Sequence, residues 1–563
     1  SLGVQVLSPD DSVGDAAAHM RRTGHEGYPV VEEGRVVGLV TRRAVDRAEQ
    51  FEMTTTSVTQ VMEAGNVTVS PQDSVEYLQQ LMIESGWGQI PVVDRGEVVG
   101  VVTRTDLIRL WGVPEEPSRR LGITARLRRG LSDPVLTLIQ RVSQTAHEMG
   151  FVPYFVGGLV RDLLLGQSIV DLDMVIEGDA IALSERLSRS VGGRVIAHRR
   201  FGTAKWILSA QVWAKVADDV SPKDELPPSV DFVTARTEFY THPTALPQVE
   251  QSSIKQDLHR RDFTINTLAI RLDPDHWGEL LDFYGGEEDL EKGVIRVLHS
   301  LSFIDDPTRI LRAARLESRL GFHLDPRSEE LIDDALPLLK RVSGDRIRHE
   351  LELIFREEEP ERAICRLDDL GALDQIHSNL TCDRWLERKY RVLRDALDRD
   401  VWGLEPEDML FMHLALLGYG LDQEGLKALS KRLKLKREQE EDLLVLLELQ
   451  GRLPELSRLE QASHITHLLE PYPARVLGVI WVASESDLIR KRLIRYQTEW
   501  RLVEATLTGA ELKAMGLRPG PLFGDLLDTL RDARLDEQVS TRAEEEALVR
   551  EMLASRNQTE EKE

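Results

Sequence analysis

Three things are scarce in this sequence, and the shortages limit what the protein can be. Two cysteines, Cys365 and Cys382, are too few for a disulfide framework and fit a reducing cytosol. No apolar run approaches the roughly 20 residues that span a membrane, and the start lacks a charged-then-apolar signal segment. Basic residues are outnumbered, with 71 Lys and Arg against 96 Asp and Glu. The first two shortages predict a cytoplasmic protein without a membrane segment.

The net charge of −25 argues at first sight against a nucleic-acid partner, because phosphate binding requires Lys and Arg. Net charge averages over domains, however, and acidic surface far from a basic groove costs little at a Debye length of about 8 Å. A chain of 563 residues is too long for one core and predicts three or more domains. Ser1 lies close to a domain start, as in a fragment of a longer protein, and whether a further domain precedes it stays open.

An internal repeat occupies the first part of the chain. Residues 28–41, Tyr-Pro-Val-Val-Glu-Glu-Gly-Arg-Val-Val-Gly-Leu-Val-Thr, return in similar form at 90–103, where Gly100 matches Gly38 at an offset of 62 residues. Each copy predicts a strand, a Gly turn, a second strand and a helix. Two such units, each with one open apolar face, are expected to bury those faces against each other.

The repeat resembles a pair of CBS domains, covering residues 1–113. In that family a Thr/Ser-x-x-Asp motif after the second strand binds the ribose and phosphate of adenosine. Thr103 and Asp106 keep this motif in the second copy, whereas Ala44 stands at the Asp position of the first. The resemblance therefore implies at most one well-formed adenine-nucleotide cleft and a homo-oligomer formed through the CBS domains. A pair that only mediates self-association is the open alternative.

The most informative stretch follows an Arg-rich linker at 114–133. It reads Tyr154-Phe-Val-Gly-Gly-Leu-Val-Arg-Asp and continues to Asp171-Leu-Asp173. An apolar strand runs into Gly157 and Gly158, where the lack of Cβ lets backbone N–H groups approach a triphosphate. Arg161 follows on the first turn of a helix and is placed to bind the same anion.

Asp171 and Asp173 point to the same face of a predicted second strand, with Leu172 between them facing the core. Adjacent carboxylates repel one another, and Mg²⁺ offsets that repulsion with hard oxygen ligands. Such a site suits phosphoryl transfer with two metal ions about 3.5–4 Å apart. An Asp-x-Asp alone is more often a solvated strand edge, but the preceding Gly-Gly-x-x-Arg-Asp favours the metal site.

This arrangement resembles the first motif of class II tRNA nucleotidyltransferases and bacterial poly(A) polymerases, a branch of the polymerase-β superfamily. Residues 257–269, Asp-Leu-His-Arg-Arg-Asp-Phe-Thr-Ile-Asn-Thr-Leu-Ala, resemble a second motif that contacts the ribose. The resemblance implies ribose contacts from Arg261, Asp262 and Asn266, the last two on one helical face at i and i+4. Two candidates lie between the motifs. Asp231 is either a third catalytic carboxylate or a structural residue, and Lys205 is a candidate phosphate contact.

A third motif addresses the choice of base. Ile304-Asp-Asp-Pro-Thr-Arg-Ile-Leu-Arg-Ala-Ala-Arg resembles the family's Glu-Asp-x-x-Arg motif, with Asp305 at the Glu position and Asp306 and Arg309 side by side on a helix. ATP and CTP both present an amine donor beside a ring acceptor, so a carboxylate and a guanidinium can pair with either. UTP and GTP would leave both groups unpaired. The alternative is an ordinary surface ion pair of little energetic value.

The sequence as a whole predicts a multidomain protein that is α/β in its first half and all-α in the rest, since periodicity from about Ser328 onward is helical only. The predicted parts are tandem CBS domains at 1–113, a linker at 114–133, a polymerase-β-like nucleotidyltransferase head at 134–270, a neck with the base-selecting helix at 271–360, and a tRNA-binding helical body and tail at 361–563. Ser343-Gly-Asp-Arg-Ile-Arg-His-Glu-Leu resembles the family's neck motif, and its arginines are candidate phosphate contacts.

The resemblance implies Mg²⁺-dependent transfer of AMP from ATP to the 3′-hydroxyl of tRNA ending in CC, because CBS-bearing members resemble the A-adding group. The loop at 237–253 is full-length, which disfavours an enzyme that adds only CC. A tail-like segment at 508–521 disfavours a poly(A) polymerase. Complete CCA addition, which also uses CTP, is the first alternative. A poly(A) polymerase and a catalytically silent adenine-nucleotide-binding regulator follow.

Overall fold

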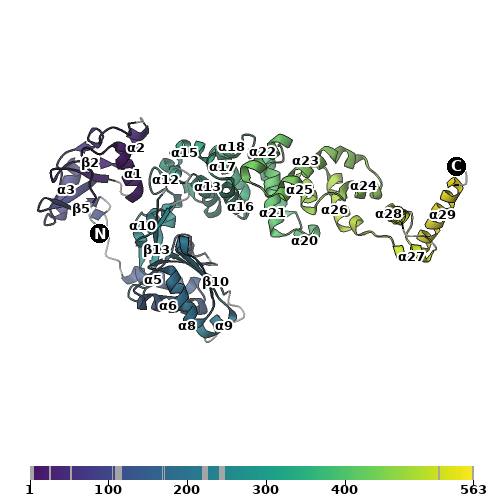
Figure 1. Ribbon diagram of the computed structural model, residues 1–563, viewed down its shortest axis with the longest axis horizontal. Helices are drawn as coiled ribbons and strands as arrows, with labels where there is room; N and C mark the ends of the chain where they lie inside the picture. The colour runs from purple at the N-terminus through teal and green to yellow at the C-terminus, as the bar shows by residue number, and fades with distance from the viewer. Residues whose placement is uncertain are drawn as a thin grey trace. The chain divides into compact units, whose positions relative to one another are not determined.

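The computed structural model contains two compact units, Ser1–Asp305 and Asp306–Glu563 (Figure 1). The structure describes residues 5–23, 27–50, 53–85, 87–103, 106–107, 117–167, 169, 171–217, 226–239, 248–515, 517 and 520–560. Within these ranges, no helix is both long enough and apolar enough to pass through a bilayer.

The repeat folds as two copies of one supersecondary unit. Its elements are α1 (Val13–Thr23), β1 (Gly27–Glu32), β2 (Arg35–Thr41), α2 (Arg42–Gln50), η1 (Val58–Gln60), β3 (Glu63–Ala64), α3 (Val75–Ser85), β4 (Gln89–Asp94) and β5 (Glu97–Thr103). The register irregularity between Val30 and Val31 recurs between Val92 and Val93, at the offset of 62 residues. Leu39 of the first copy packs into the core of the second. The two copies therefore share buried apolar surface, as the repeat predicts.

The predicted adenine-nucleotide motif forms a closed turn in the second copy. Both the backbone N–H and the hydroxyl of Thr103 donate to the Asp106 carboxylate, at 2.8 and 2.7 Å. In the first copy the backbone N–H of Ala44 donates to the Thr41 hydroxyl at 3.3 Å, and no carboxylate is available at position 44. The difference between the copies follows directly from the Asp-to-Ala difference in sequence.

The head is built on a seven-stranded sheet in the order β14-β13-β6-β7-β10-β9-β8. Its elements are α5 (Pro117–Gly130), α6 (Asp133–Glu148), β6 (Val152–Val156), α7 (Gly158–Leu164), β7 (Leu172–Glu177), α8 (Ala180–Val191), β8 (Arg194–His198), η2 (Arg199–Phe201), β9 (Thr203–Ile207), α9 (Ala210–Val216), β10 (Ser229–Thr234), β11 (Arg236–Phe239), β12 (Gln248–Gln251), α10 (Ile254–His259), η3 (Thr264–Asn266), β13 (Leu268–Arg271), β14 (Leu280–Asp282), α11 (Gly286–Lys292), β15 (Val294–Ile295) and α12 (Ser302–Asp305). Helices α6, α8 and α9 lie along one side of this sheet (Figure 1).

Strand alternation separates the two faces of the sheet. Leu172, Trp206 and Val230 are buried on the side that α8 covers. The residues adjacent to them in sequence, Asp173 and Lys205 among them, therefore point to the opposite face. Asp173 and Lys205 thus lie on the face opposite α8, where α10 covers only the neighbouring apolar residues of the sheet, among them Tyr154 and Val175.

The Arg-rich stretch predicted as a linker contains helix α5, which packs on the head. Ile123 and Leu127 are buried, and the Arg120 Nε donates to the Trp277 carbonyl at 2.9 Å. The many arginines predicted an exposed linker. Local composition does not show that one of them donates to a backbone carbonyl more than 150 residues away.

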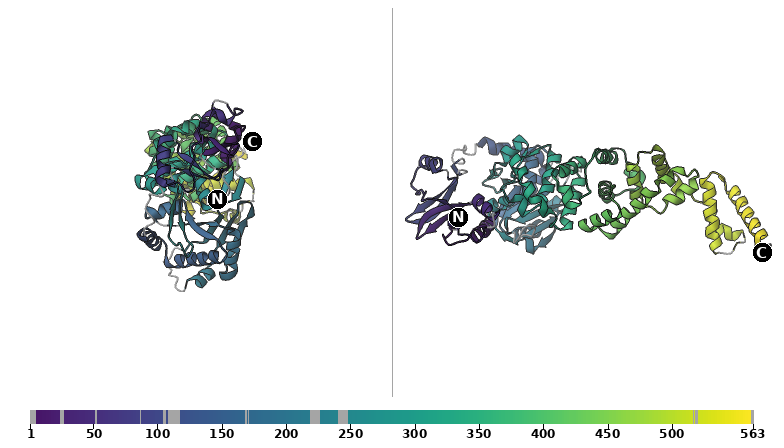
Figure 2. Two further views of the ribbon diagram at one scale, coloured as in Figure 1. Left: turned by 90° about the vertical axis from the view of Figure 1, so that its left-hand side faces the viewer. Right: turned by 90° about the horizontal axis from the view of Figure 1, so that it is seen from above.

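The second unit is helical apart from the short strand β16 (His323–Leu324), as predicted, and everything drawn in bright green and yellow in Figure 2 is helix or connection. Its helices are α13 (Thr308–Leu320), α14 (Pro326–Glu330), α15 (Ile332–Leu339), α16 (Gly344–Phe355), α17 (Pro360–Asp369), α18 (Ala372–Ile376), α19 (Arg384–Asp395), α20 (Arg399–Trp402), α21 (Pro406–Leu417), α22 (Gln423–Leu433), α23 (Arg437–Arg458), α24 (Ala462–Leu469), α25 (Ala474–Ala483), α26 (Asp487–Thr498), η4 (Trp500–Leu502), α27 (Gly509–Ala514), α28 (Pro521–Leu535) and α29 (Arg542–Glu560).

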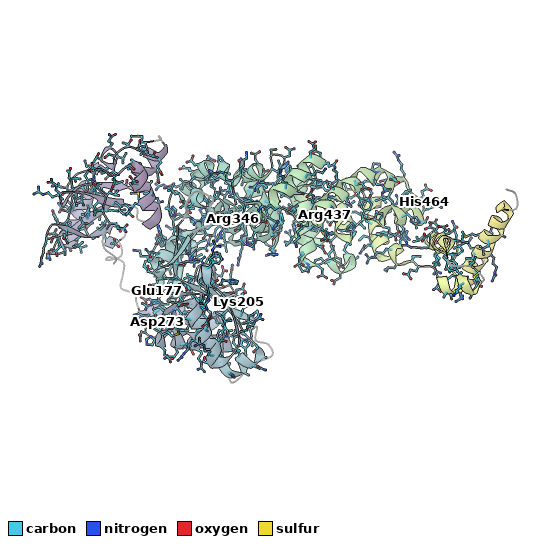
Figure 3. The ribbon with its side chains drawn as sticks, in the orientation of Figure 1. Glu177, Lys205, Asp273, Arg346, Arg437 and His464 are labelled. Carbon is cyan, nitrogen blue, oxygen red and sulfur yellow. A yellow bond between two sulfur atoms is a disulfide. The ribbon has the colours of Figure 1, made fainter. Side chains whose placement is uncertain are left out.

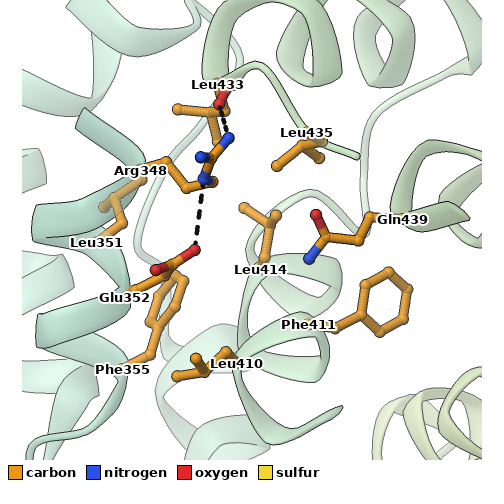
Figure 4. Close-up of a pocket in the computed structure, with 10 residues that line it drawn as sticks. All are labelled: Arg348, Leu351, Glu352, Phe355, Leu410, Phe411, Leu414, Leu433, Leu435 and Gln439. Atoms are coloured by element: carbon orange, nitrogen blue, oxygen red, sulfur yellow. Dashed lines mark hydrogen bonds and ion pairs between the residues drawn. The ribbon is translucent and has the colours of Figure 1, made fainter. Parts of the chain in front are cut away.

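The neck helix α16 is held closely against the end of α22. The Arg348 guanidinium donates to the Leu433 carbonyl at 2.9 Å and lies 3.5 Å from Glu352, at the edge of a small cavity (Figure 4). Lys434 pairs with Asp345 at 2.7 Å. Arg348, one of the neck arginines predicted as a candidate phosphate contact, is thus used within the fold to hold these two helices together.

The two cysteines form a disulfide, with their Cα atoms 4.8 Å apart. The cysteine count predicted no disulfide framework, and one bond is not a framework, but the pairing itself was not anticipated. Cys365 lies in α17 and Cys382 follows α18, so the turn between these helices brings together residues separated by 17 positions. Sequence spacing alone does not show this return of the chain.

Candidate active site

A glycine corner joins β6 to α7. Gly157 has φ +69° and ψ −129°, a conformation that residues with a side chain rarely adopt. A Cβ at this position would lie 2.6 Å from Nη1 of Arg261, so the guanidinium packs directly over the turn. The Gly157 N–H donates to the Leu268 carbonyl at 3.0 Å. The corner therefore brings Arg261 to the predicted triphosphate site, while the N–H of Gly157 is already bonded within the fold.

The predicted triphosphate and ribose residues form one buried hydrogen-bond chain. Arg161 is only 4% exposed, and its Nη1 donates to the Asn266 side-chain oxygen at 2.8 Å. The Asn266 amide donates in turn to the Asp262 carboxylate at 2.9 Å. Arg161 also pairs with Asp162 at 2.7 Å. Residues predicted from two separate motifs, Arg161 in the first and Asp262 and Asn266 in the second, therefore lie together, and the hydrogen bond from Arg161 orients Asn266.

The prediction that Asp262 and Asn266 share one helical face is wrong. Helix α10 ends at His259, and Asn266 belongs to the separate 3₁₀ turn η3. Phe263 between them is extended, with φ −130° and ψ 152°, and its ring is fully buried. Burial of this aromatic side chain outweighs continuation of the helix, and the side-chain hydrogen bond brings the two polar residues together instead.

Asp257, to which the sequence assigned no role, anchors both arginines of the second motif. Its side chain is fully buried and pairs with Arg260 at 2.8 Å and Arg261 at 3.0 Å. Burial acts to raise the pKa of Asp257, but the two guanidinium groups outweigh it and hold that pKa below its usual value. Spacings of three and four residues within α10 and the turn after it were the signal that could have revealed this anchor.

The acids lie in a row across the open face of the sheet. Strands β7 and β10 are parallel, with Asp173 directly opposite Asp231. Asp231 in turn lies opposite Lys205 on β9 (labelled in Figure 3), and the two form an ion pair at 2.7 Å. Asp171 immediately precedes β7 rather than lying within it. The structure therefore brings Asp231, the uncertain third acid, beside the Asp-x-Asp pair.

The electrostatics of the row favour a cation. Partial burial raises the pKa of Asp173, and the neighbouring carboxylates of Asp231 and Asp171 raise it further, while Lys205 and Arg261 oppose them. Within the described ranges, no three His, Cys, Asp or Glu side chains form a ready-made metal cluster. Mg²⁺ is commonly bound by one or two carboxylates together with substrate phosphates. The mutual repulsion of Asp171, Asp173 and Asp231 would be relieved by such an ion, and the exposed sides of Asp171 and Asp173 leave room for it.

The predicted base-selecting residues surround the start of α13. Asp305 ends α12, and Arg309 is buried in the first turn of α13. Asp306 precedes the helix, and its carboxylate accepts from the Thr308 N–H at 3.1 Å and from Arg346 of α16 at 2.7 Å. The pairing with Arg346 was missed because the partners are 40 residues apart.

In the loop predicted to be full-length, residues 240–247 lie outside the described residues. Its two flanks, β11 and β12, pair as an antiparallel ribbon, with Arg236 opposite Gln251.

Comparison with known protein families finds matches in three parts of the chain: the repeat, the head and the start of the helical unit. Residues 153–296 match a family profile described as the poly(A) polymerase head domain, and residues 321–383 match one described as a probable RNA- and SrmB-binding site of polymerase A. Residues 3–50 and 58–112 each match the CBS domain. The profiles cover the repeat, the glycine corner, the acid row and the neck.

Two curated relatives are A-adding tRNA nucleotidyltransferases. That of Geobacter sulfurreducens is 33% identical over 95% of this chain and 62% of its own length. That of Halalkalibacterium halodurans is 32% identical over 70% of this chain and 88% of its own. This chain thus spans less than two thirds of the length of the first relative but most of the second.

Solved structures agree with this grouping. The Thermotoga maritima CCA-adding enzyme, in complex with tRNA, is 29% identical, with a TM-score of 0.62 over 77% of this chain and 98% of its own. Nucleotidyltransferases of this kind generally use divalent metal ions. The chain therefore belongs to the tRNA nucleotidyltransferase and poly(A) polymerase family, with a tandem CBS pair ahead of its head domain.

Proposed function

We propose that this protein transfers AMP from ATP to the 3′-hydroxyl of tRNA ending in CC and releases pyrophosphate. The observation that carries the chemistry is the row of Asp173 and Asp231, with Asp171 beside it, on the open face of the head sheet. The choice of a terminal adenosine is supported by the A-adding relatives, which match over 95% and 70% of this chain.

In this proposal Asp171 and Asp173 hold two Mg²⁺ ions, and Asp231 is a third catalytic carboxylate beside them. When bound, such ions activate the attacking hydroxyl and neutralise charge on the leaving pyrophosphate. The 3′-oxygen forms a bond to the α-phosphorus as the bond from that phosphorus to the bridging oxygen breaks, and the hydroxyl proton passes to solvent. The chain's own residues hold the substrates in place for this exchange.

The glycine corner and its buried hydrogen-bond chain orient the nucleotide. Gly157, Gly158 and Arg161 are assigned to the triphosphate, and the Arg261 guanidinium packs over Gly157. Arg261, Asp262 and Asn266 are assigned to the ribose, and the Arg161 hydrogen bond to Asn266 fixes the orientation of that amide. Because these hydrogen bonds are buried and already formed in the free protein, their side chains lose little conformational entropy when the nucleotide binds.

Base selection is assigned to Asp305, Asp306 and Arg309. A carboxylate that accepts from the adenine amine and a guanidinium that donates to the ring nitrogen discriminate against UTP and GTP, which would leave buried polar groups unpaired. Thr308 and Arg346 fix the position of Asp306 and support this role. CTP satisfies the same pair, so discrimination against CTP requires a further element.

One assay separates the candidate activities. The protein is incubated with Mg²⁺, one labelled nucleotide at a time, and tRNA that ends without a tail, in C, or in CC. Labelling of CC-ended tRNA by ATP alone supports the proposal. Incorporation of CTP selects complete CCA addition, which the similarity to the Thermotoga maritima structure favours as second candidate. Long A tracts on unrelated RNA select a poly(A) polymerase, and no labelling with any substrate selects a silent regulator.

The CBS pair is proposed to bind one adenine nucleotide at Thr103 and Asp106 and to join copies of the chain into a homo-oligomer, in the cytoplasm. The closed Thr103–Asp106 turn supports the first assignment. Calorimetric titration of the full chain with AMP is expected to give at most one site per chain. Unchanged binding by the Asp106→Ala variant would contradict the assignment, and light scattering measures the oligomer.

A further inference from the structure

The acid row continues sideways across the sheet to its last strand. Asp231 lies opposite Lys205 on β9, and Lys205 lies opposite Ile196 on β8. Because directly paired residues point to the same face, Ile196 shares the face of the acids. Arg194 and His198, two positions to either side on β8, share it too. A stripe of side chains therefore leads from the acids to the end of the sheet.

This end of the face is open. Among the described strands, β8 is the last in the sheet order, and Arg194, Ile196 and His198 are all exposed, Ile196 to 38%. The turn that follows ends in Phe201, which is 48% exposed, with the Arg200 guanidinium 5.6 Å from its ring centre. The opposite face of the same strands is covered by α8. Two exposed apolar side chains, Ile196 on the strand and Phe201 in the turn, therefore lie beside cations at this end of the sheet.

The charge of this segment contrasts with that of the whole chain. Residues 194–205, Arg-Val-Ile-Ala-His-Arg-Arg-Phe-Gly-Thr-Ala-Lys, contain four Lys or Arg, one His and no carboxylate, in a protein of net charge −25. A cationic surface with exposed apolar and aromatic side chains suits single-stranded nucleic acid, because cations meet the phosphates and flat side chains stack with unpaired bases.

We propose that this surface, the edge platform (Arg194, Ile196, His198, Phe201 and Lys205), binds the unpaired 3′-terminal nucleotides of the acceptor RNA. The inference rests on the proposed function and adds a seat for the acceptor strand. Arg194 and Lys205 contact backbone phosphates, and Phe201 stacks with a base. Continuity with the acid row selects this occupant over a protein partner, since a strand on the platform ends beside Asp231 and Asp173.

Steady-state kinetics with CC-ended tRNA test the platform. The Phe201→Ala variant is expected to raise KM for tRNA roughly five- to fifty-fold, the range for loss of one base stack, with KM for ATP unchanged. The Arg194→Glu variant should raise KM for tRNA and reduce its salt dependence by about one unit of slope, as expected on loss of one phosphate contact. If the platform binds RNA, these substitutions therefore raise KM for tRNA and leave KM for ATP unchanged.

The matched control is Arg189→Glu. Arg189 lies on α8, on the covered side of the same strands, and its side chain is 72% exposed. This variant makes the same charge change in the same domain, so equal effects of the Arg189 and Arg194 variants would assign the result to net charge and overturn the platform. All three variants alter exposed side chains and are expected to keep the wild-type Tm.

The outcomes separate the platform from the proposed function. If the wild type transfers AMP and both platform variants keep the wild-type KM for tRNA, the platform is wrong and the function stands. If the wild type transfers nothing, the proposed function fails, and anisotropy with a labelled CC-ended oligonucleotide decides the platform alone. Binding weakened by Arg194→Glu but not by Arg189→Glu supports it, and equal binding by all three proteins overturns it.

Discussion

Asp173, which we propose as a metal ligand, is a residue whose charge costs stability in the folded protein. Its pKa is raised by partial burial and by two neighbouring carboxylates, so its ionised form is destabilised at neutral pH when no cation is present. We predict that the Asp173→Asn variant has a higher Tm than wild type in EDTA and gains less from added Mg²⁺. Thermal melts at pH 7 with and without Mg²⁺ measure both effects, and an identical Mg²⁺ response in the two proteins would remove Asp173 from the metal site.

The pKa of Asp257 is shifted in the opposite direction to that of Asp173, so its charge stabilises the folded protein. Its pKa lies below the ordinary 3.8 because Arg261 and Arg260 outweigh its burial, so the ion pairs contribute stability above that pH and lose it as the pH falls through the lowered value. Replacement by alanine leaves two guanidinium groups without their carboxylate, and we predict a loss of about 3 kcal/mol in the free energy of unfolding at pH 7. The difference between wild type and variant should shrink below pH 4, and a difference that is constant with pH would contradict the assignment.

Arg309 tests the base-selecting assignment. The Arg309→Ala variant is expected to lose at least about tenfold of its preference for ATP over UTP, the effect of one buried hydrogen bond to a charged group. Competition between the two labelled nucleotides on CC-ended tRNA measures this preference. A variant with lower overall activity but unchanged preference would make Arg309 a structural residue of α13.

At the scale of single residues, the sequence pointed to the acids and the glycines because each motif is short and its physics is local. Alternation in a strand put Leu172 in the core, as the structure shows. The contacts of Asp306 with Arg346 and of Arg161 with Asn266 were not predictable, because 40 and 105 positions separate the partners. Only the fold brings these residues together.

At the scale of elements, the close contact between α16 and the end of α22, called here the joint, gives the clearest prediction. A Cβ on Gly344 would overlap the carbonyl oxygen of Arg432, which is backbone and cannot rotate away. We predict that Gly344→Ala lowers the free energy of unfolding by about 1–3 kcal/mol, the usual cost of overpacking. Chemical denaturation measures it.

Gly451 provides the matched control for this substitution. It lies within α23, and nothing lies within 4 Å of an added Cβ. Gly451→Ala should stabilise by about 0.5–1 kcal/mol, since alanine is the better helix former. Equal effects of the two substitutions would show that the joint is not closely packed.

Element boundaries were the least predictable part of the fold. The spacing of Asp262 and Asn266 fits a helix, yet burial of the Phe263 ring divides the segment into α10 and η3. The Arg-rich stretch before the head similarly became α5, because its apolar residues Ile123 and Leu127 bury against the domain. In both cases tertiary packing outweighed the local pattern.

At the scale of the whole molecule, the repeat, the glycine corner and the helical periodicity together gave the correct order of parts, and the family assignment agrees with it. The acidic total of −25 gives no indication of the basic surface that we propose to bind RNA. The proposed edge platform is a local basic segment, and at physiological ionic strength charges more than about 8 Å away are largely screened.

The central claim is that the acid row transfers a nucleotide to RNA. The most direct measurement is Mg²⁺-dependent incorporation of AMP from α-labelled ATP into CC-ended tRNA, by wild type and by the Asp173→Asn variant at matched tRNA occupancy. The account predicts one AMP per tRNA for wild type and a rate lower by roughly 10³-fold or more for the variant, since metal-bound charge stabilisation is worth several kcal/mol. Equal rates in the two proteins would contradict it.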